Sequence, residues 1–534
     1  MNDFELNLRK SLGVPIKEKK PAEVFRELTV FWAHFAIYKR KCDGSGKTIY
    51  SVYDDNCPFP VWDKTYWVEN ANPPSAIFDF SRGFYDQLYD LFKNCPIPHN
   101  CGINNINCDY TDDCWHSKNC YLCHSLLQGE DCHYCFRIVN NKDCYFTVFS
   151  NDLELCLDVI NSSNLYKVNY AINCQKCTNS SFLFDCRGVE DCFMCYNLRN
   201  KKYCFRNEQL TKEQYEENMR MIDLSSTSTY NRIKTEFHEI IKTKAYFKAI
   251  YQEQCENSYG NYLENCKNAQ NVFLSNHVED TINTIRAFQV KSSINCVSPA
   301  LNSERLYYCS VIEENSYECK FCDNLTNCKF LEYCEHCLNC EYCFGCRGLV
   351  NKKYHILNKE YSPAEYQELT TKIKEKIIND GLEDVFFPPY FAANNYEDSL
   401  ANVIWPLKEE EKNKGYRISK NISTRQVNYL DSSLIPDSCK LINSDITKNI
   451  YWDDIYQKPF SIRPEDIEFA KKTNTPLHHT YYLRRLKDNY KWVFFDGELR
   501  KTTCAKTGQE IFTTIPREYD GRILSNEAYL DLIV

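Results

Sequence analysis

A run of evenly spaced cysteines is the feature of this sequence best suited to chemistry. Residues 334–346 carry five cysteines at intervals of three, with His336 among them. Thiolates and imidazole are preferred zinc ligands, and thiolates also hold iron–sulfur clusters. One hypothesis is therefore a metal-binding or redox protein that uses the cysteines of residues 319–346, with zinc or an iron–sulfur cluster as cofactor. The candidate ligands are Cys334, Cys337, Cys340, Cys343 and Cys346.

The interval of three extends far beyond this cluster. Every third position from 111 to 198 holds 12 cysteines, nine aliphatic residues and no charged residue, whereas the other two columns hold all 17 charged residues of that stretch. A second stretch keeps one phase from Gly260 to Cys296 and another from Cys319 to Leu349, after two one-residue slips. A dedicated metal site does not require this wider pattern, so the favoured interpretation is a buried column without a cofactor.

A period of three matches neither an α-helix nor a plain strand. Long 3₁₀ helices are unstable, and a collagen helix needs glycine at every third position, whereas this chain has only 15 glycines. The pattern favours a tight β-solenoid whose lumen takes every third side chain, and it resembles the cysteine-lined β-helices of insect antifreeze proteins. The cysteines expected to line the lumen are Cys114, Cys120, Cys123, Cys132, Cys135, Cys144, Cys174, Cys177, Cys186, Cys192, Cys195, Cys319, Cys322 and Cys328.

Two halves of the chain end alike. Leu198-Arg-Asn-Lys-Lys-Tyr203 and Leu349-Val-Asn-Lys-Lys-Tyr354 are 151 residues apart, and each precedes an asparagine, Asn207 or Asn358. Thr211 with Gln214, and Ser362 with Glu365, have the spacing of helix capping boxes. We therefore expect a duplicated block, each copy closed by a helix. The alternative, that the two asparagines are site residues, is less favoured.

The expected fold is mainly β with α+β flanks. Its segments are an N-terminal mixed domain (1–100), β-solenoid block 1 (101–210), capping helices (211–254), β-solenoid block 2 (255–358), a capping helix (359–380) and a C-terminal α+β domain (381–534). The flanks share a motif, because Cys42-Asp-Gly-Ser45-Gly matches Cys504-Ala-Lys-Thr507-Gly. A zinc ribbon begins with a second cysteine where Ser45 and Thr507 stand, so we expect hairpins of zinc-ribbon type that bind no metal.

Composition and motifs argue against several classes of function. The net charge of −9 weakens the case for nucleic-acid binding, which the zinc-ribbon-like ends would otherwise suggest. No P-loop, G-x-G-x-x-G, H-E-x-x-H or G-x-S-x-G motif is present, and we expect no enzymatic activity. The sequence has no signal-peptide pattern and no apolar run long enough to span a membrane, which favours a cytoplasmic protein with reduced thiols; a virus particle is the alternative.

Several longer segments resemble an uncharacterised cysteine-rich β-solenoid family that is common in candidate-phyla (Patescibacteria-type) bacteria and has relatives in large DNA viruses. The matching segments are CDGSGKTIYSVY (42–53), FDFSRGFYDQLYDL (78–91), the two Leu-x-Asn-Lys-Lys-Tyr blocks, FFPPYFAANNYEDSLANVIWPLKEEE (386–411) and CAKTGQEIFTTIPREY (504–519). The family has no established activity. Its typical members carry more complete zinc-ribbon cysteines, which places metal binding by these flanks in doubt.

Solenoid faces commonly serve as recognition surfaces, and the outward columns here are rich in Tyr, Asn, Asp and Lys. The expected function is accordingly a structural or interaction scaffold for a protein partner or for self-assembly, including a virion or surface assembly.

Overall fold

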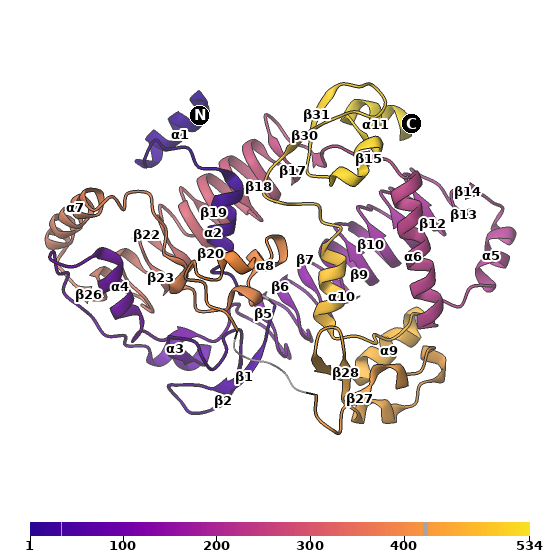
Figure 1. Cartoon of the computed structure of the whole chain (residues 1–534), viewed down its shortest axis with the longest axis horizontal. Helices are drawn as coiled ribbons and strands as arrows, with labels where there is room; N and C mark the ends of the chain where they lie inside the picture. Colours follow the sequence, from indigo (N-terminus) through magenta and orange to yellow (C-terminus); the bar gives the residue numbers. More distant parts are fainter. Residues whose placement is uncertain (34, 420–424, 534) are drawn as a thin grey trace.

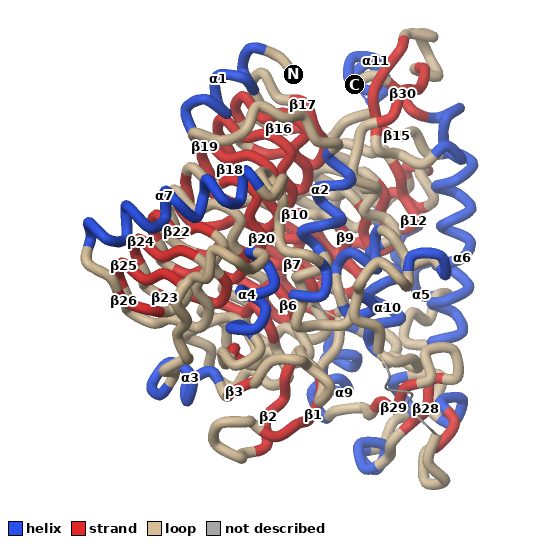
Figure 2. The backbone as a smooth tube through the Cα atoms, turned by 60° about the vertical axis from the view of Figure 1, so that its left-hand side comes forward, coloured by secondary structure: helices blue, strands red, loops and turns tan. Residues whose placement is uncertain are grey.

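The computed structural model describes residues 1–33, 35–419 and 425–533 and combines β-strands with α-helices. Most strands belong to two long parallel ladders that lie side by side, with helices and short hairpins around them (Figure 1). The tube view shows the strands of each ladder stacked like rungs (Figure 2).

The first ladder advances 12 residues from each strand to the next. His124 pairs with Phe136, Phe136 with Val148, and the same step continues to the pairing of Phe193 with Phe205. Because twelve residues contain four steps of three, the chain passes four inward positions before it pairs with the preceding strand again. Its strands are β5 (Asp112–Trp115), β6 (His124–Leu127), β7 (Phe136–Val139), β8 (Lys142–Tyr145), β9 (Val148–Ile160), β10 (Ser163–Ile172), β11 (Thr178–Phe184), β12 (Phe193–Tyr196) and β13 (Cys204–Phe205).

The second ladder keeps the same step with three exceptions. Gln252 pairs with Leu263, one residue short, whereas Ile294 pairs with Tyr307 and Ser310 with Asp323, one residue long. Its strands are β16 (Gln252–Glu253), β17 (Tyr259–Glu264), β18 (Lys267–Ile285), β19 (Phe288–Glu304), β20 (Tyr307–Glu313), β21 (Asp323–Thr326), β22 (Lys329–Glu332), β23 (Glu335–Leu338), β24 (Glu341–Phe344) and β25 (Lys353–Ile356).

The two long steps account for the two slips in the cysteine column. Each adds one residue at a corner, where two neighbours adopt left-handed backbone: Leu301 and Asn302 (φ 46° and 62°), and Glu314 and Asn315 (φ 25° and 52°). Elsewhere in the ladders nearly every third residue has positive φ. Asparagine tolerates this conformation better than most residues, and Asn327, Asn339 and Asn351 stack through amide hydrogen bonds of 2.8 and 3.0 Å.

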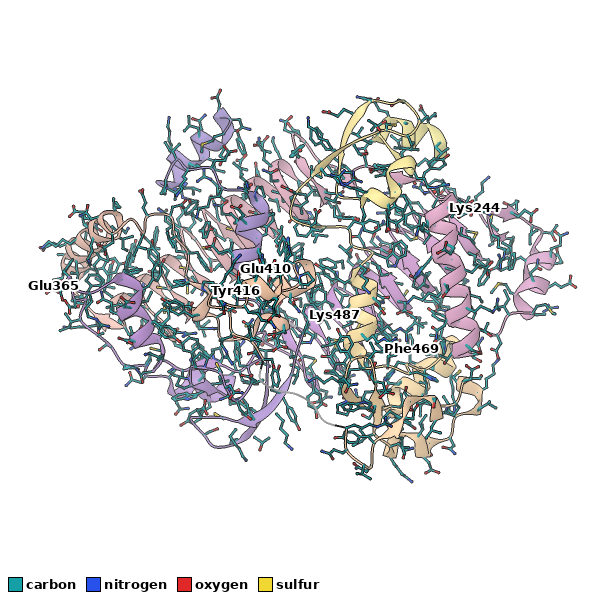
Figure 3. All side chains as sticks on the ribbon, in the orientation of Figure 1. Lys244, Glu365, Glu410, Tyr416, Phe469 and Lys487 are labelled. Atoms are coloured by element: carbon teal, nitrogen blue, oxygen red, sulfur yellow. The ribbon has the colours of Figure 1, made fainter. Side chains whose placement is uncertain are left out.

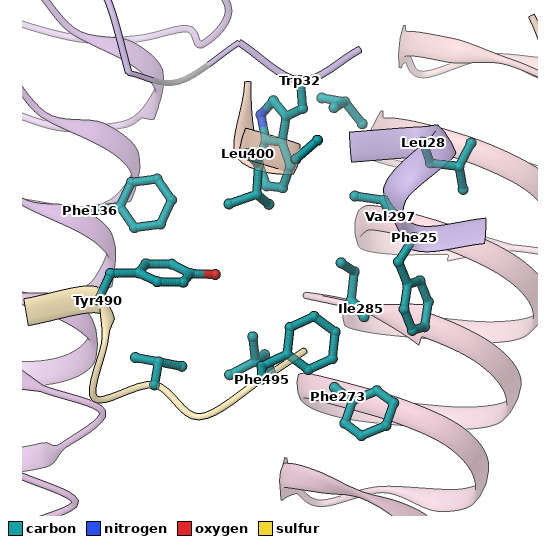
Figure 4. Close-up of a cluster of buried hydrophobic side chains, with 14 of the residues drawn as sticks. Phe25, Leu28, Trp32, Phe136, Phe273, Ile285, Val297, Leu400, Tyr490 and Phe495 are labelled. Atoms are coloured by element: carbon teal, nitrogen blue, oxygen red, sulfur yellow. The ribbon is translucent and has the colours of Figure 1, made fainter. Parts of the chain in front are cut away.

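An aromatic core fills the space between the ladders (Figure 4). Phe25 contacts Phe273 of the second ladder, with ring centroids 6.1 Å apart, and Phe136 of the first ladder contacts Tyr490 at 6.1 Å. The Arg286 guanidinium lies 3.8 Å from the centre of the Trp32 ring. The segments that carry Phe25, Trp32 and Tyr490 come from the two flanks of the sequence, so the flanks join the ladders into one body.

The helices pack on the outside of the ladders. In α10, Arg485 and Asn489 bind the carboxylate of Asp158 on β9 at 2.8 and 3.0 Å. Although burial opposes ionisation, these bonds and the Arg485 charge lower the pKa of Asp158 to about 2. The α-helices are α1 (Asp3–Leu12), α2 (Pro21–Thr29), α3 (Lys64–Asn70), α4 (Phe84–Phe92), α5 (Lys212–Arg220), α6 (Thr227–Lys244), α7 (Pro363–Asn379), α8 (Leu400–Ile404), α9 (Pro464–Thr473), α10 (Tyr482–Tyr490) and α11 (Asn526–Ile533).

Short elements complete the chain. The remaining strands are β1 (Tyr38–Lys41), β2 (Thr48–Ser51), β3 (Val61–Trp62), β4 (Ile97–Pro98), β14 (Glu208–Gln209), β15 (Phe247–Lys248), β26 (Lys359–Glu360), β27 (Leu430–Asp431), β28 (Tyr451–Asp453), β29 (Lys458–Phe460), β30 (Arg500–Thr503), β31 (Glu510–Thr513) and β32 (Ile523–Leu524). The 3₁₀ helices are Pro389–Phe391, Tyr396–Asp398, Glu409–Glu411, Ser432–Leu434, Cys439–Leu441, Ser444–Lys448 and Arg517–Arg522. In the part of the chain described, no helix is both long and apolar enough to cross a membrane.

Both predicted capping boxes are present. Thr211 caps α5 with Gln214 at the third helical position, and Ser362 caps α7 with Glu365. Glu365 lies at the outer edge of the molecule, on the left of Figure 3. The helices cover different amounts of surface, because α5 buries Tyr215 alone whereas α7 buries four residues.

Candidate functional site

The fourteen cysteines predicted to line a lumen are all buried. They pack with leucine, isoleucine and valine side chains in two clusters, one inside each ladder. Their thiols donate to backbone carbonyls: Cys123 Sγ lies 3.3 Å from the oxygen of Tyr121 and 3.2 Å from that of Cys132. Ser150 and Ser162, at equivalent positions, also donate to the carbonyl two residues earlier. Small side chains with a weak donor therefore suit this interior.

The five candidate metal ligands are buried in the second ladder. Cys334, Cys337, Cys340 and Cys343 take the four inward positions of one 12-residue repeat, and Cys346 follows in the next. The Cys337 thiol donates to the backbone carbonyls of Glu335 and Cys346 at 3.4 and 3.9 Å, and the Cys343 thiol donates to that of Glu341 at 3.5 Å. Burial raises the pKa of Cys346 well above its usual range, which favours the protonated thiol.

Histidine does not complete this cluster as a ligand set. His336 has left-handed backbone at a position between inward residues, and burial, together with the Arg347 charge, lowers its pKa well below the usual value. Among the residues that the structure describes, no group of three or more His, Cys, Asp or Glu side chains has an arrangement that could hold a metal ion.

The two flanking cysteine motifs form matching hairpins. Cys42 lies at the turn between β1 and β2, and its Sγ accepts the N–H groups of Ser45 (3.3 Å) and Asp63 (3.2 Å). Cys504 lies at the turn between β30 and β31 and accepts the N–H of Ser525, 21 residues later, at 3.3 Å. Although burial opposes ionisation, hydrogen bonds from Thr507, Ser525 and Lys506 lower the pKa of Cys504 to about 6. N–H and O–H donors thus surround each sulfur.

Each hairpin docks where a ladder begins. Strand β3, which follows the first hairpin, pairs with β4, just before the first ladder. Strand β32, which follows the second hairpin, pairs with β15, just before the second ladder. Ser51 donates to the carbonyl of His99 at 3.1 Å, and Thr513 donates to that of Ala249 at 2.8 Å. The motif echo in the sequence indicated similar hairpins but not their docking positions, since these depend on contacts between distant segments.

Asn207 and Asn358 have equivalent places at the other ends of the ladders. Each is the second residue of a two-residue turn with positive φ at both positions, in the hairpins β13–β14 and β25–β26. The Asn207 amide bonds to the carbonyl and N–H of Tyr196, and the Asn358 amide does the same to Arg347. Both asparagines therefore have a structural role, since each bonds to the backbone groups at the end of its ladder.

A polar groove lies between the ladders and has a volume of about 440 Å³. We call it the inter-ladder groove; Asp152, Asn173, Arg187, Glu253, Glu264 and Asn276 line it. Glu253 and Glu264 are direct neighbours on β16 and β17. Like charges in such positions repel each other, so this pair is not explained by stability. Arg187 binds Glu253 at 2.6 Å, whereas Asn276 donates its amide to Glu264 at 2.9 Å.

The periodic pattern of the sequence does not predict this groove. The one-residue-short step that brings Glu253 beside Glu264 leaves a visible signal, because it separates Cys255 from Cys266 by 11 residues instead of 12. Asp152 belongs to the first ladder, and no pattern in the sequence around it predicts that it lines a groove with Glu253 and Glu264.

A scan against protein-family models and a search of curated proteins found no match to this chain.

Proposed function

We propose that this chain is a non-enzymatic scaffold, in which two cysteine-lined β-solenoid blocks present their outer faces to a partner protein or to an assembly of copies. The observation that carries the proposal is the separation of residue types. In both ladders the cysteine side chains point into the interior, where burial raises the pKa of Cys337 and Cys346. The charged side chains point away from it, whether exposed like Lys118 or buried against the flanks like Asp158. Because buried thiols are out of reach of a substrate, we infer that recognition at the surface is the activity best matched to this arrangement.

The outer faces carry regularly spaced charges. Lys118, Glu130 and Lys142 follow one another on successive repeats of the first ladder, with N–O distances of 3.5 and 3.7 Å. Lys291 and Glu279 do the same on the second ladder at 2.8 Å. Exposed ion pairs of this kind contribute little to stability, so the faces are free to be selected for binding.

Site-specific photo-crosslinking in the native source tests the proposal. A photoreactive phenylalanine analogue would replace Tyr166, which is 39% exposed on the first ladder, or Met221, which is 85% exposed beyond α5. We expect position 166 to yield one reproducible crosslinked protein and position 221 to yield none. No specific product from Tyr166, Tyr259 on the second ladder, or positions in the inter-ladder groove would contradict the scaffold function.

A second candidate function is binding of zinc or an iron–sulfur cluster by Cys334, Cys337, Cys340, Cys343 and Cys346. The observation in its favour is the repeat with cysteine at all four inward positions, whose side chains are buried together in one cluster. Elemental analysis of protein purified without oxygen tests it. About one equivalent of metal would support this candidate, and colourless, metal-free protein would reject it.

A further inference from the structure

The inter-ladder groove contains more negative charge than its own residues neutralise. Of its carboxylates, Glu253 pairs with Arg187 at 2.6 Å. Glu264 accepts from the Asn276 amide, and Asp152 accepts from the amides of Asn140 and Asn151 at 3.3 and 3.1 Å. Although Glu264 is exposed, partial desolvation in the groove, followed by the charges of Glu253 and Asp152, raises its pKa. A cation placed between these groups would relieve their repulsion.

The groove also holds buried polar atoms without partners among the described residues. Asn173 is only 7% exposed, and its Nδ2 donor has no acceptor. The Oδ1 acceptor of Asn276 has no donor. Leaving such atoms unpaired costs free energy, so a ligand that supplies one acceptor and one donor would be favoured. A peptide group has both, in its C=O and N–H.

The other groups that face the groove restrict the ligand further. Arg137 donates to the carbonyl of Arg286 at 3.3 Å, and Arg187 is held by Glu253, so neither guanidinium is poised for an anion. A phosphate would meet three carboxylates. Phe149 and Phe288 add apolar surface, on which the methylene stem of a lysine can pack. The volume of about 440 Å³ is within the usual range of ligand pockets, roughly 300–1,000 Å³.

We propose that the inter-ladder groove binds a basic segment of a partner protein. A lysine ammonium lies among Asp152, Glu253 and Glu264, and the adjacent peptide group bonds to Asn173 and Asn276. This inference rests on the proposed scaffold function and assigns the partner's chemistry at one site.

Calorimetric titration of the full chain with a short peptide tests the inference. The probe is Gly-Lys-Ser-Gly, acetylated and amidated at its ends, and its matched control has acetyl-lysine in place of lysine. We expect the lysine peptide to bind at least tenfold more tightly than the control. Its affinity should fall as salt rises, because the contact is electrostatic.

Variants identify the site. Glu264→Gln and Asp152→Asn should each weaken binding of the lysine peptide about tenfold, whereas Glu154→Gln should not, because Glu154 is an exposed carboxylate of β9 that does not line the groove. Equal affinity for the two peptides, no measurable binding, or equal losses in all three variants would overturn the inference. If photo-crosslinking still captures a partner through the outer faces, only the groove assignment fails. If neither experiment detects a contact, the scaffold function fails with it.

Discussion

The side-chain amide of Asn358 bonds to both backbone groups of Arg347. Its Nδ2 donates to the Arg347 carbonyl at 3.1 Å, and its Oδ1 accepts the Arg347 N–H at 3.0 Å. In the body of the ladder those groups would pair with the peptide groups of the next repeat. The Asn358 side chain thus replaces the hydrogen bonds that a following strand would make to Arg347. Asn207 does the same for Tyr196, with distances of 2.9 and 2.8 Å.

Replacing this amide should destabilise the protein. We expect Asn358→Ala to lower the free energy of unfolding by about 2–4 kcal/mol, because two buried backbone groups lose their partners at about 1–3 kcal/mol each. Urea unfolding measures the change. Asn351→Ala is the matched control, since Asn351 has a similar φ of 55° but bonds to no backbone group in this way. A control as unstable as the Asn358 variant would show that backbone conformation alone causes the loss.

The left-handed corners lead to a second prediction. Asn339 is exposed and has a φ of 53°, which glycine adopts freely and valine does not. We expect Asn339→Val to cost about 1–3 kcal/mol and Asn339→Gly to cost less than about 1 kcal/mol. Urea unfolding of the two variants gives the difference. Equal losses would mean that the amide stack, which both variants remove, matters more than the backbone.

How far the sequence could predict this fold depends on the range of the interactions. The interval of three identified the buried positions because each repeat applies the same constraint to its own residues. The capping boxes at Thr211 and Ser362 could also be predicted from the sequence, since a helix cap is a local feature. The repeat length of 12 residues could not be predicted, because a period of three identifies the inward positions but not the number of inward positions in one turn.

Features formed by distant segments lay beyond the sequence analysis. Strand β32, which follows the hairpin at Cys504, pairs with β15, more than 200 residues earlier, as Ile523 does with Phe247. The groove needs Asp152 and Glu264 from different ladders. Neither relationship leaves a periodic pattern, since each depends on how the ladders and flanks pack together.

Thiol reactivity should separate interior from surface cysteines. All 32 cysteines are free thiols, and only Cys57, Cys101, Cys108 and Cys255 are partly exposed. A hydrogen bond from the Cys266 thiol lowers the pKa of Cys255 to about 7, whereas burial raises that of Cys57 and Cys101. We therefore expect Cys255 to react first with a thiol reagent at pH 7.5, because the thiolate is the reactive form.

The same assay has a clear control and endpoint. Cys255→Ser should remove the fastest phase, and Cys108→Ser should leave it unchanged. In denaturant the wild-type chain should titrate near 32 thiols. Rapid reaction of many more than four thiols in the folded protein would contradict a closed interior, and a large deficit after unfolding would reveal disulfides.

Stability should fall with rising pH because of Asp112. Burial raises the pKa of this carboxyl from its ordinary 3.8 to about 7, although the hydrogen bond that it accepts from the Cys101 N–H at 2.8 Å acts in the opposite direction. Below pH 3.8 the folded and unfolded states both hold the proton. As pH rises toward 7 the unfolded state loses the proton first, so unfolding becomes more favourable until the folded carboxyl also ionises. This difference between the folded and unfolded pKa corresponds to about 4 kcal/mol of stability.

Asp112→Asn keeps an oxygen for the Cys101 N–H but cannot ionise. The variant should therefore gain about 4 kcal/mol relative to wild type between pH 3.5 and pH 7.5 in urea titrations, while Asp109→Asn, an exposed neighbour, should show no such gain. A constant difference between Asp112→Asn and wild type across this range would show that Asp112 ionises as readily in the folded protein as in the unfolded chain.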